Sequence, residues 1–376
     1  MNQPRPQWMF SSFLVFFVVH TIQVGVGLPG FQRYVYEPAG NDAWISVILA
    51  GISSHISAFF MVKILQRYHS CDLYEIHEHL FGKWLGKAAN ALYTAYLAMA
   101  CFIIVINYID IIQTWLFPTF TSTSLSLILL AVAVYGVLGG IRVIAGFGFI
   151  SIVLTAWMAL LVYFAKPYIQ WDQLFPIMDH KLTDILEGAR VMSYTLAGFE
   201  IVFFIYPYVK EKEKTMRYTH LGLLATTLIS LELMVVALLY FEGEQLMKTA
   251  WATFTMYKII QFPFLERFEF LAVSLWMLII MPNILLYMWA SIRGFRRLTG
   301  RSQRMGIILV CILILGLSNV FTTRMRIDQL DSVFNQITFF IAFLYPILLY
   351  PLVLFKTRTK PDQSATVPAA QGGEAD

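Results

Sequence analysis

The sequence predicts an all-α integral membrane protein of about ten transmembrane helices, arranged as a five-plus-five inverted repeat with breaks in helices one and six. Three observations support this prediction. Of the 376 residues, 58% are hydrophobic and only 13% are charged, whereas soluble domains typically have about 25% charged residues. Nearly the whole chain divides into apolar windows of membrane-spanning length. Glycine-containing interruptions fall at similar depth in the first and sixth windows, as in transporters with inverted repeats.

The windows follow one another with short polar connections. The third and eighth are longer than about 30 Å of hydrocarbon requires, so we expect those two helices to tilt. Residues 1–355 should form one transmembrane domain, followed by a disordered cytoplasmic tail, 356–376, which is rich in small and polar residues. The windows lie near residues 9–34, 43–64, 84–116, 124–140, 143–165, 186–208, 218–241, 264–296, 305–321 and 334–355.

The distribution of basic residues predicts the orientation. With ten spans, eighteen Lys and Arg residues fall in the connections of one face and seven in those of the other. Basic residues favour the cytoplasmic side, so both termini should be cytoplasmic. No basic stripe suggests a nucleic-acid partner, and the 3 cysteines suggest no disulfide framework. Residues 244–262 are too polar to cross and place apolar residues at helical spacing, so we expect them along the outer interface.

The two interruptions predict a ligand site. Residues 23–30 and 194–199 hold the glycines, and Pro29 suits the first turn of a new helix. Amides near 28–31 then suit a carboxylate, and carbonyls near Val24 and Ala197 suit an ammonium group. The alternative is that these glycines only allow close helix packing. The predicted ligand-binding residues are Val24, Gly25, Gly27, Leu28, Thr195, Ala197 and Gly198 from the interruptions, together with Asn283 beside Pro282 in window eight.

Four further polar residues lie inside apolar windows and are candidates for a gate or polar path: His20, Asn107, Tyr108 and Glu200. An ionisable group at membrane depth is by default a functional candidate. Structural pairing, for example of Glu200 with His20, is the equally simple interpretation.

Chemistry of other kinds is not expected. His77 and His79 do not share a helical face, and the metalloprotease spacing is absent, so we expect no metal site. The sequence also shows no phosphate-binding loop, nucleophile elbow or catalytic carboxylate pair. We therefore expect no cofactor and no enzymatic activity.

Four segments carry a family resemblance: 24–29 at the first interruption, 42–47 (DAWISV), 80–86 (LFGKWLG) and 206–210 (YPYVK). With these segments the chain resembles the membrane-embedded B subunit of bacterial spore germinant receptors, within the amino acid/polyamine/organocation transporter superfamily. The resemblance covers essentially the whole chain up to the tail.

This resemblance implies a protein of the spore inner membrane that contacts membrane lipid and acts with a receptor A subunit and a C lipoprotein subunit. It implies a small nutrient as ligand, with amino acids the first choice, and a transporter scaffold used as a sensor. The main alternative is a proton-coupled amino-acid transporter. Some relatives in that superfamily have a lysine in span five, and residues 143–165 contain no basic residue, which favours the sensor. A water or ion conduit is a third alternative, but few polar residues support it.

Overall fold

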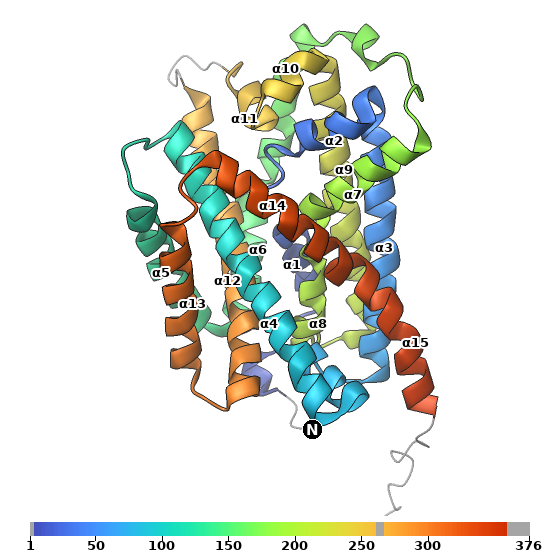
Figure 1. Ribbon diagram of the computed structural model, residues 1–376, viewed down its shortest axis with the longest axis vertical. Helices are drawn as coiled ribbons and strands as arrows, with labels where there is room; N and C mark the ends of the chain where they lie inside the picture. The colour runs from blue at the N-terminus through green and yellow to red at the C-terminus, as the bar shows by residue number, and fades with distance from the viewer. Residues whose placement is uncertain (1–3, 261–266, 359–376) are drawn as a thin grey trace, which may run out of the picture.

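A computed structural model describes residues 4–260 and 267–358, which form a bundle of helices (Figure 1). Within those ranges the strand-type pairing is limited to one bridge, between Phe10 and Val209. In chain order the helices are α1 (Phe13–Gln23), α2 (Phe31–Ala39), α3 (Ala43–Arg67), α4 (Leu73–Trp115), α5 (Ser122–Leu138), α6 (Gly140–Thr155) with a 3-10 continuation (Ala156–Tyr168), α7 (Leu182–Leu196), α8 (Val202–Ile205), α9 (Thr215–Tyr240), α10 (Gly243–Lys248), α11 (Ala252–Tyr257), α12 (Phe268–Thr299), α13 (Gln303–Ser318), α14 (Arg324–Thr338), a π-helix (Phe339–Leu344) and α15 (Tyr345–Arg358).

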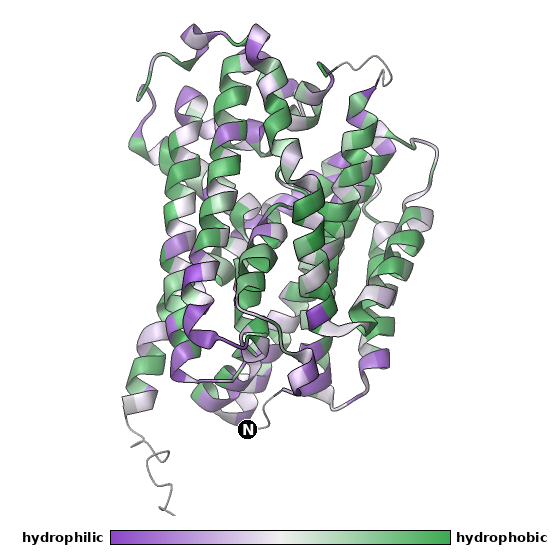
Figure 2. Cartoon of the chain, turned by 180° about the vertical axis from the view of Figure 1, so that it is seen from behind, coloured by the Kyte–Doolittle hydropathy of each residue, from purple (hydrophilic) through white to green (hydrophobic). Residues whose placement is uncertain are grey.

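The bundle has the surface of a multi-pass membrane protein. In the described chain, 6 helical runs are long and apolar enough to cross a membrane, or 7 if α7 and the helical turns after it count as one bent span. Three shorter apolar helices, α1, α5 and α13, accompany them. Figure 2 shows hydrophobic residues along the helices and hydrophilic residues gathered towards their ends. All ten predicted windows coincide with helices, while the number of spans and the inverted repeat stay predictions.

The third and eighth windows form the two longest helices of the described chain, α4 with 43 residues and α12 with 32. The side chain of Asp72 accepts from the amide of Glu75 and caps α4. Gly82, with φ of 77°, kinks its first turns. In Figure 1, α4 crosses the front of the bundle obliquely.

Two expectations concern chain segments at the edges of the bundle. The segment from Gly243 to Tyr257, expected along the outer interface, packs onto the bundle with Leu246, Phe254 and Tyr257 buried, and its placement at the interface stays a prediction. The amide of Thr253 donates to the carbonyl of Pro29 (3.0 Å), so α11 covers the start of α2. The predicted tail begins too early, since residues 356–358 complete α15. The rest of that tail, 359–376, and the predicted interfacial residues 261 and 262 lie outside the described residues.

Candidate ligand site

The first break separates α1 from α2. Helix α1 ends at Gln23, and the chain turns until α2 begins at Phe31. The Gly25 amide donates to the Gln23 carbonyl (2.9 Å) and the Gly30 amide to the Gly27 carbonyl (3.1 Å). In the described part of the chain, the amides of the three residues 26–28 have no hydrogen-bond partner. Unpaired amides just before a helix can hold an anionic group.

The second break separates α7 from α8 and bends the helix axis by 50°. Ala197 is extended and Gly198 has φ of 106°, a conformation that residues with a side chain rarely adopt. A Cβ at Gly198 would also lie 3.0 Å from the carbonyl oxygen of Ile22. Glycine is therefore required here both by the backbone conformation and by the close approach of α1.

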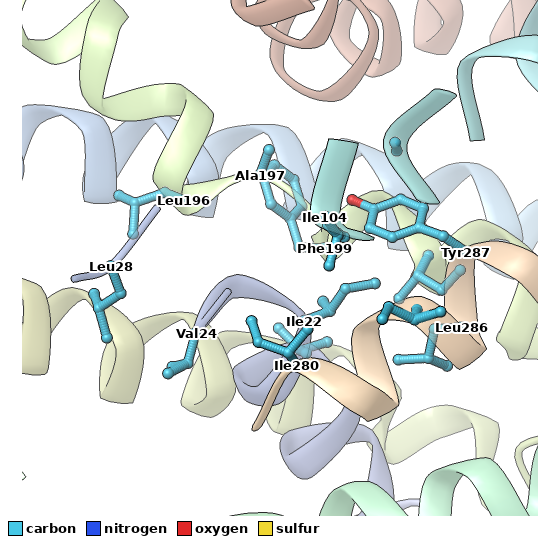
Figure 3. Close-up of a cluster of buried hydrophobic side chains, with 14 of the residues drawn as sticks. Ile22, Val24, Leu28, Ile104, Leu196, Ala197, Phe199, Ile280, Leu286 and Tyr287 are labelled. Carbon is cyan, nitrogen blue, oxygen red and sulfur yellow. The ribbon is translucent and has the colours of Figure 1, made fainter. Parts of the chain in front are cut away.

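The two breaks touch each other. A Cβ added at Gly27 would lie 2.8 Å from the hydroxyl oxygen of Thr195. The side-chain amide of Gln23 donates to the carbonyl of Leu196, which joins the ends of α1 and α7. Figure 3 shows Val24 and Leu28 of the first break and Leu196 and Ala197 of the second among the buried side chains of this region. The fold therefore brings together residues about 170 positions apart in the sequence.

A cavity of about 50 Å³ lies between the breaks. The lining is mostly apolar and includes no charged side chain. Two of the lining residues, Gln23 and Thr338, each have a buried side-chain oxygen, Oε1 and Oγ1, with no hydrogen-bond partner within the described residues. Buried polar atoms are normally satisfied, so these two mark positions where a ligand or water can bind. The cavity is lined by Ile22, Gln23, Gly25, Val26, Gly27, Tyr96, Ala100, Ile103, Ile104, Tyr194, Thr195, Ala197, Tyr287, Phe334 and Thr338.

A larger vestibule of about 540 Å³ adjoins this cavity, towards the end of the bundle opposite the N-terminus. Tyr194 and Thr195 line both spaces and stand between them. Charged side chains, among them Glu187, Arg190 and Asp328, line the vestibule. The vestibule is thus a polar space that leads to the breaks.

Asp331 of α14 organises the boundary between the two spaces. Its Oδ1 accepts a hydrogen bond from the hydroxyl of Tyr194 (3.1 Å) and from the side-chain amide of Asn107 (3.0 Å). These contacts join α7, α4 and α14 beside the cavity. The boundary is therefore a hydrogen-bonded closure whose members come from three helices.

Glu200 connects the second break to the surrounding helices. It is fully buried, and its Oε2 accepts from the amide of Gly198 (2.8 Å). Its Oε1 accepts from the hydroxyls of Tyr96 on α4 (2.8 Å) and Tyr287 on α12 (3.1 Å). Because both tyrosines also line the cavity, a change there acts directly on the hydrogen bonds of Glu200.

At the N-terminal end the two chain segments that lead away from the breaks are joined. The amide of Phe10 donates to the carbonyl of Tyr208 (3.0 Å), and the amide of Lys210 donates to the carbonyl of Phe10 (3.0 Å). The carboxylate of Glu211 accepts from the amide of Ser12 (2.8 Å). These bonds join the two segments at the end of the bundle opposite the vestibule.

The predicted site residues separate into groups. Gly25, Gly27, Thr195 and Ala197 line the central cavity. Val24, Leu28 and His20 instead line a second cavity of about 50 Å³ on the other side of the first break.

Other predicted residues have structural partners. His20 bonds to Thr226 (2.8 Å) and not to Glu200. The hydroxyl of Tyr108 donates to the carbonyl of Val273 (3.3 Å). The amide of Asn283 contacts the carbonyl of Val24 at 3.5 Å, the limit of a hydrogen bond.

The sequence alone did not mark four residues as site residues, although all four lie in or beside the cavity: Tyr96, Tyr287, Asp331 and Thr338. Each is a polar residue within or next to an apolar window, which was the available signal. Nothing in the sequence distinguished Tyr96, Tyr287 and Thr338 from the many other tyrosines and threonines of the windows, and Asp331 lies just before the last window.

Known proteins similar to this chain agree on one family. Residues 9–327 match the family model described as "Spore germination protein". The chain is 34% identical to spore germination protein GerQB of Bacillus cereus, over 93% of this chain and 97% of that protein. It is 21% identical to spore germination protein A2 of Bacillus subtilis (strain 168), over 95% of this chain and 99% of the relative.

The fold is also similar to a solved structure, a Na⁺-coupled sialic acid symporter in a substrate-bound outward-open state. The TM-score is 0.63 at 11% sequence identity, and the match covers 95% of this chain and 80% of the symporter. At this identity the likeness concerns the transporter fold alone.

Proposed function

The chain belongs to the family of spore germination proteins, and we propose that it is the subunit of a germinant receptor that senses a nutrient, most simply an amino acid. The observation that carries this proposal is the contact between the two helix breaks, with a cavity between them and a polar vestibule beside them. The family and the transporter fold both imply a role other than catalysis.

The groups around the cavity suit an amino acid. No charged side chain lines it, so the ligand's carboxylate must be met by uncharged donors. The unpaired amides of Val26 and Gly27, which line the cavity in the break before α2, supply such donors. The oxygen atoms of Gln23 and Thr338 that lack partners in the described chain can accept from the ammonium group. The apolar remainder of the lining suits a small side chain.

The size of the cavity explains how binding becomes a signal. A cavity of about 50 Å³ has room for roughly three to five water molecules, at about 10–15 Å³ each. Amino acids with a side chain larger than that of glycine have more non-hydrogen atoms than this and need a wider cavity. Binding therefore favours an arrangement in which the lining residues have moved apart, and the population shifts to that arrangement. Since Tyr96 and Tyr287 belong to the lining, α4 and α12 move with it.

The remaining parts of the proposal rest on the family and on charge. A receptor A subunit and a C lipoprotein subunit are the proposed partners, and the spore inner membrane is the proposed location. The excess of Lys and Arg on one face supports cytoplasmic termini. In that orientation the vestibule faces away from the cytoplasm, towards arriving nutrients.

A proton-coupled amino-acid transporter is the second candidate. One observation favours it: the cavity adjoins a vestibule at one end only of the described bundle, while the segments at the other end are joined by hydrogen bonds, which fits one state of alternating access. The sensor and the transporter share the binding site and differ in whether the ligand is released at the second side.

Two measurements test the proposal together. Spores that lack this chain are exposed to a panel of single amino acids, and germination is followed by the fall in optical density. We expect at least one response to be lost and to return with the wild-type gene. The purified chain is then reconstituted in proteoliposomes with the same amino acid. Binding without uptake supports the sensor; saturable, concentrative uptake supports the transporter instead. An unchanged germination response to every amino acid in the panel contradicts the proposed ligand class.

A further inference from the structure

Two histidines on neighbouring helices share one hydrogen bond. Helices α3 and α9 pack side by side (Figure 1), and Nδ1 of His55 on α3 lies 2.7 Å from Nδ1 of His220 on α9. The two rings are parallel, with an interplanar angle of 2° and centroids 5.0 Å apart. Both side chains are half-buried. Within the described chain, this is the one side-chain hydrogen bond that joins α3 to α9.

This bond limits how many protons the pair can hold. One of the two facing Nδ1 atoms must donate and the other must accept, so only one of them can carry a proton. The pair can therefore take up one extra proton and form a charge-assisted hydrogen bond. A second extra proton would oppose two N–H groups and two positive charges. Separated histidine rings have no such limit, and each gains a proton below its usual pKa of about 6.5.

The surroundings of the pair are basic rather than acidic. Among the described residues, the charged neighbour of His55 is His220, and no acidic side chain acts on either ring. Arg217 lies about one helical turn from His220 on α9, and Lys63 lies about two turns from His55 on α3. A second positive charge on the pair therefore has no counter-charge close by.

Other titratable groups on the adjoining elements have different partners or lie further away. His20 of α1 bonds to Thr226 (2.8 Å). Glu200, beside α3, accepts hydrogen bonds from Gly198 and two tyrosines. The charged side chains of α2 and α7 that line the vestibule lie at the vestibule end of the bundle. The remaining groups are Arg67 of α3, Glu232 of α9, Lys212, Glu213 and Lys214 before α9, and Tyr345, Tyr350 and Lys356 of α15.

The helices that the pair joins support both broken helices. Gly222 of α9 lies close against α1, since a Cβ there would be 2.9 Å from the carbonyl oxygen of Phe16. On the other side, the hydroxyl of Ser46 on α3 donates to the carbonyl of Ile185 on α7 (2.8 Å). Helices α1 and α7 end at the two breaks. A change in the contact between α3 and α9 therefore reaches both breaks.

We propose that the His55–His220 pair is a proton-binding site that holds α3 against α9 when it carries one extra proton or none, and releases them when a second one binds. His220 lies about 8 Å from the start of α9, at 1.5 Å per residue. That start follows Lys210, which pairs with Phe10. Protons therefore reach the pair from the side of the membrane on which the N-terminal end of the bundle lies.

The direction of the response follows from the proton count. The joined pair carries fewer protons than two separated rings, so acid favours separation. The joined arrangement is fully favoured above about pH 6.5 and loses ground as the pH falls. At pH 5, about 1.5 units below the pKa of a free histidine, the equilibrium should have moved towards separation by about 30-fold.

Thermal unfolding at different pH values tests the proposal. The full-length chain in nanodiscs is melted between pH 8 and pH 5 and followed by tryptophan fluorescence. The amide of an asparagine can donate or accept, so His220→Asn should keep a bond to His55 in either charge state of that ring. Over this range the melting temperature of wild type should fall at least about 3 °C more than that of His220→Asn. A purely structural role would shift the melting temperature equally at every pH.

Two further variants complete this test. His55→Asn should show the same reduced pH dependence as His220→Asn, because the two rings respond as a pair. His69→Asn is the matched control: His69 is an exposed histidine between α3 and α4, and this variant should keep the wild-type pH dependence. Equal pH dependence of wild type and His220→Asn overturns the proposal.

A second measurement needs no variant. The wild-type protein is labelled with ¹⁵N in its histidine rings and studied in liposomes by solid-state NMR. A proton shared between two Nδ1 atoms correlates the signals of two rings, and the described structure contains one such pair. We expect this correlation at pH 8 and at least a halving of its intensity at pH 5. Its absence at pH 8, or an unchanged intensity at pH 5, overturns the proton site. None of these readouts requires a nutrient, so their outcome is independent of the proposed function.

Discussion

The contact between the two breaks gives the sharpest prediction, tested by Gly27→Ala. A Cβ at Gly27 would lie 2.8 Å from Oγ1 of Thr195 and 3.4 Å from its Cα and Cβ. Overpacking of this kind costs about 1–3 kcal/mol. Since about 1.4 kcal/mol corresponds to a tenfold change in an equilibrium constant, a cost of this size shifts the balance between the narrow and the widened arrangement of the cavity, and the half-maximal nutrient concentration should change roughly 5- to 150-fold. The methyl group also takes up part of the cavity that the nutrient must enter.

The assay is a dose response of spores to the amino acid that wild-type spores recognise, followed by optical density. Gly146→Ala is the matched control, because a Cβ at Gly146 meets nothing within 4 Å in the described structure. Thr195→Ala in the Gly27→Ala background removes the 2.8 Å contact and leaves only contacts of ordinary length. The double variant should therefore reverse at least half of this change, as a double-mutant cycle measures. A wild-type dose response for Gly27→Ala, or no recovery in the double variant, refutes contact between the breaks.

Three further predictions concern single residues. Gly198→Ala forces a side chain into a left-handed conformation beside the Ile22 carbonyl, so the purified protein should lose about 2–4 kcal/mol of stability; an unchanged melting temperature contradicts this. Tyr287→Phe removes one hydrogen bond of Glu200 at a cost of about 1–3 kcal/mol. The half-maximal nutrient concentration should change at least threefold in dose-response curves, while immunoblots show wild-type protein levels. An unchanged half-maximal concentration contradicts this role of Tyr287. Burial raises the pKa of the Cys71 thiol from 9.0 to about 12, so iodoacetamide at pH 8 should label it at least 100-fold more slowly than in the unfolded chain, with the rate still rising above pH 9. Because this folded pKa is raised, the stabilisation from the neutral thiol is full below pH 9 and is lost as pH rises towards 12; equal rates in the folded and unfolded chain contradict a buried thiol.

The two helix breaks were predictable from the local sequence. Gly25, Gly27 and Gly198 are signals in the chain itself, and the structure breaks the helices at these residues. Long-range contacts were not predictable in the same way. The partners of Glu200 come from α4 and α12, and no spacing rule relates them to position 200. Asp331 was missed because its role depends on Tyr194 and Asn107, which are far away in the sequence.

For the segment from Gly243 to Tyr257, the local sequence pattern predicted a helix but did not predict where that helix packs. Its apolar residues repeat at helical spacing, which fits an interfacial helix and a buried helix equally well. Its position is tied to the break in the first span, because the buried carbonyl of Pro29 has no partner within a helix and the amide of Thr253 donates to it. A gap in one helix thus fixes where another helix packs.

The pairing of Phe10 with Tyr208 and Lys210 determines what a neighbouring subunit can detect. The half-helices below both breaks are tied together at their far ends, so neither can swing alone. A change of angle at one hinge must carry the other half-helix with it, and the surface formed by residues 4–12 and 206–214 shifts as a single block. On the proposed function, a partner subunit that rests on that block receives one displacement, whichever break the nutrient opens first.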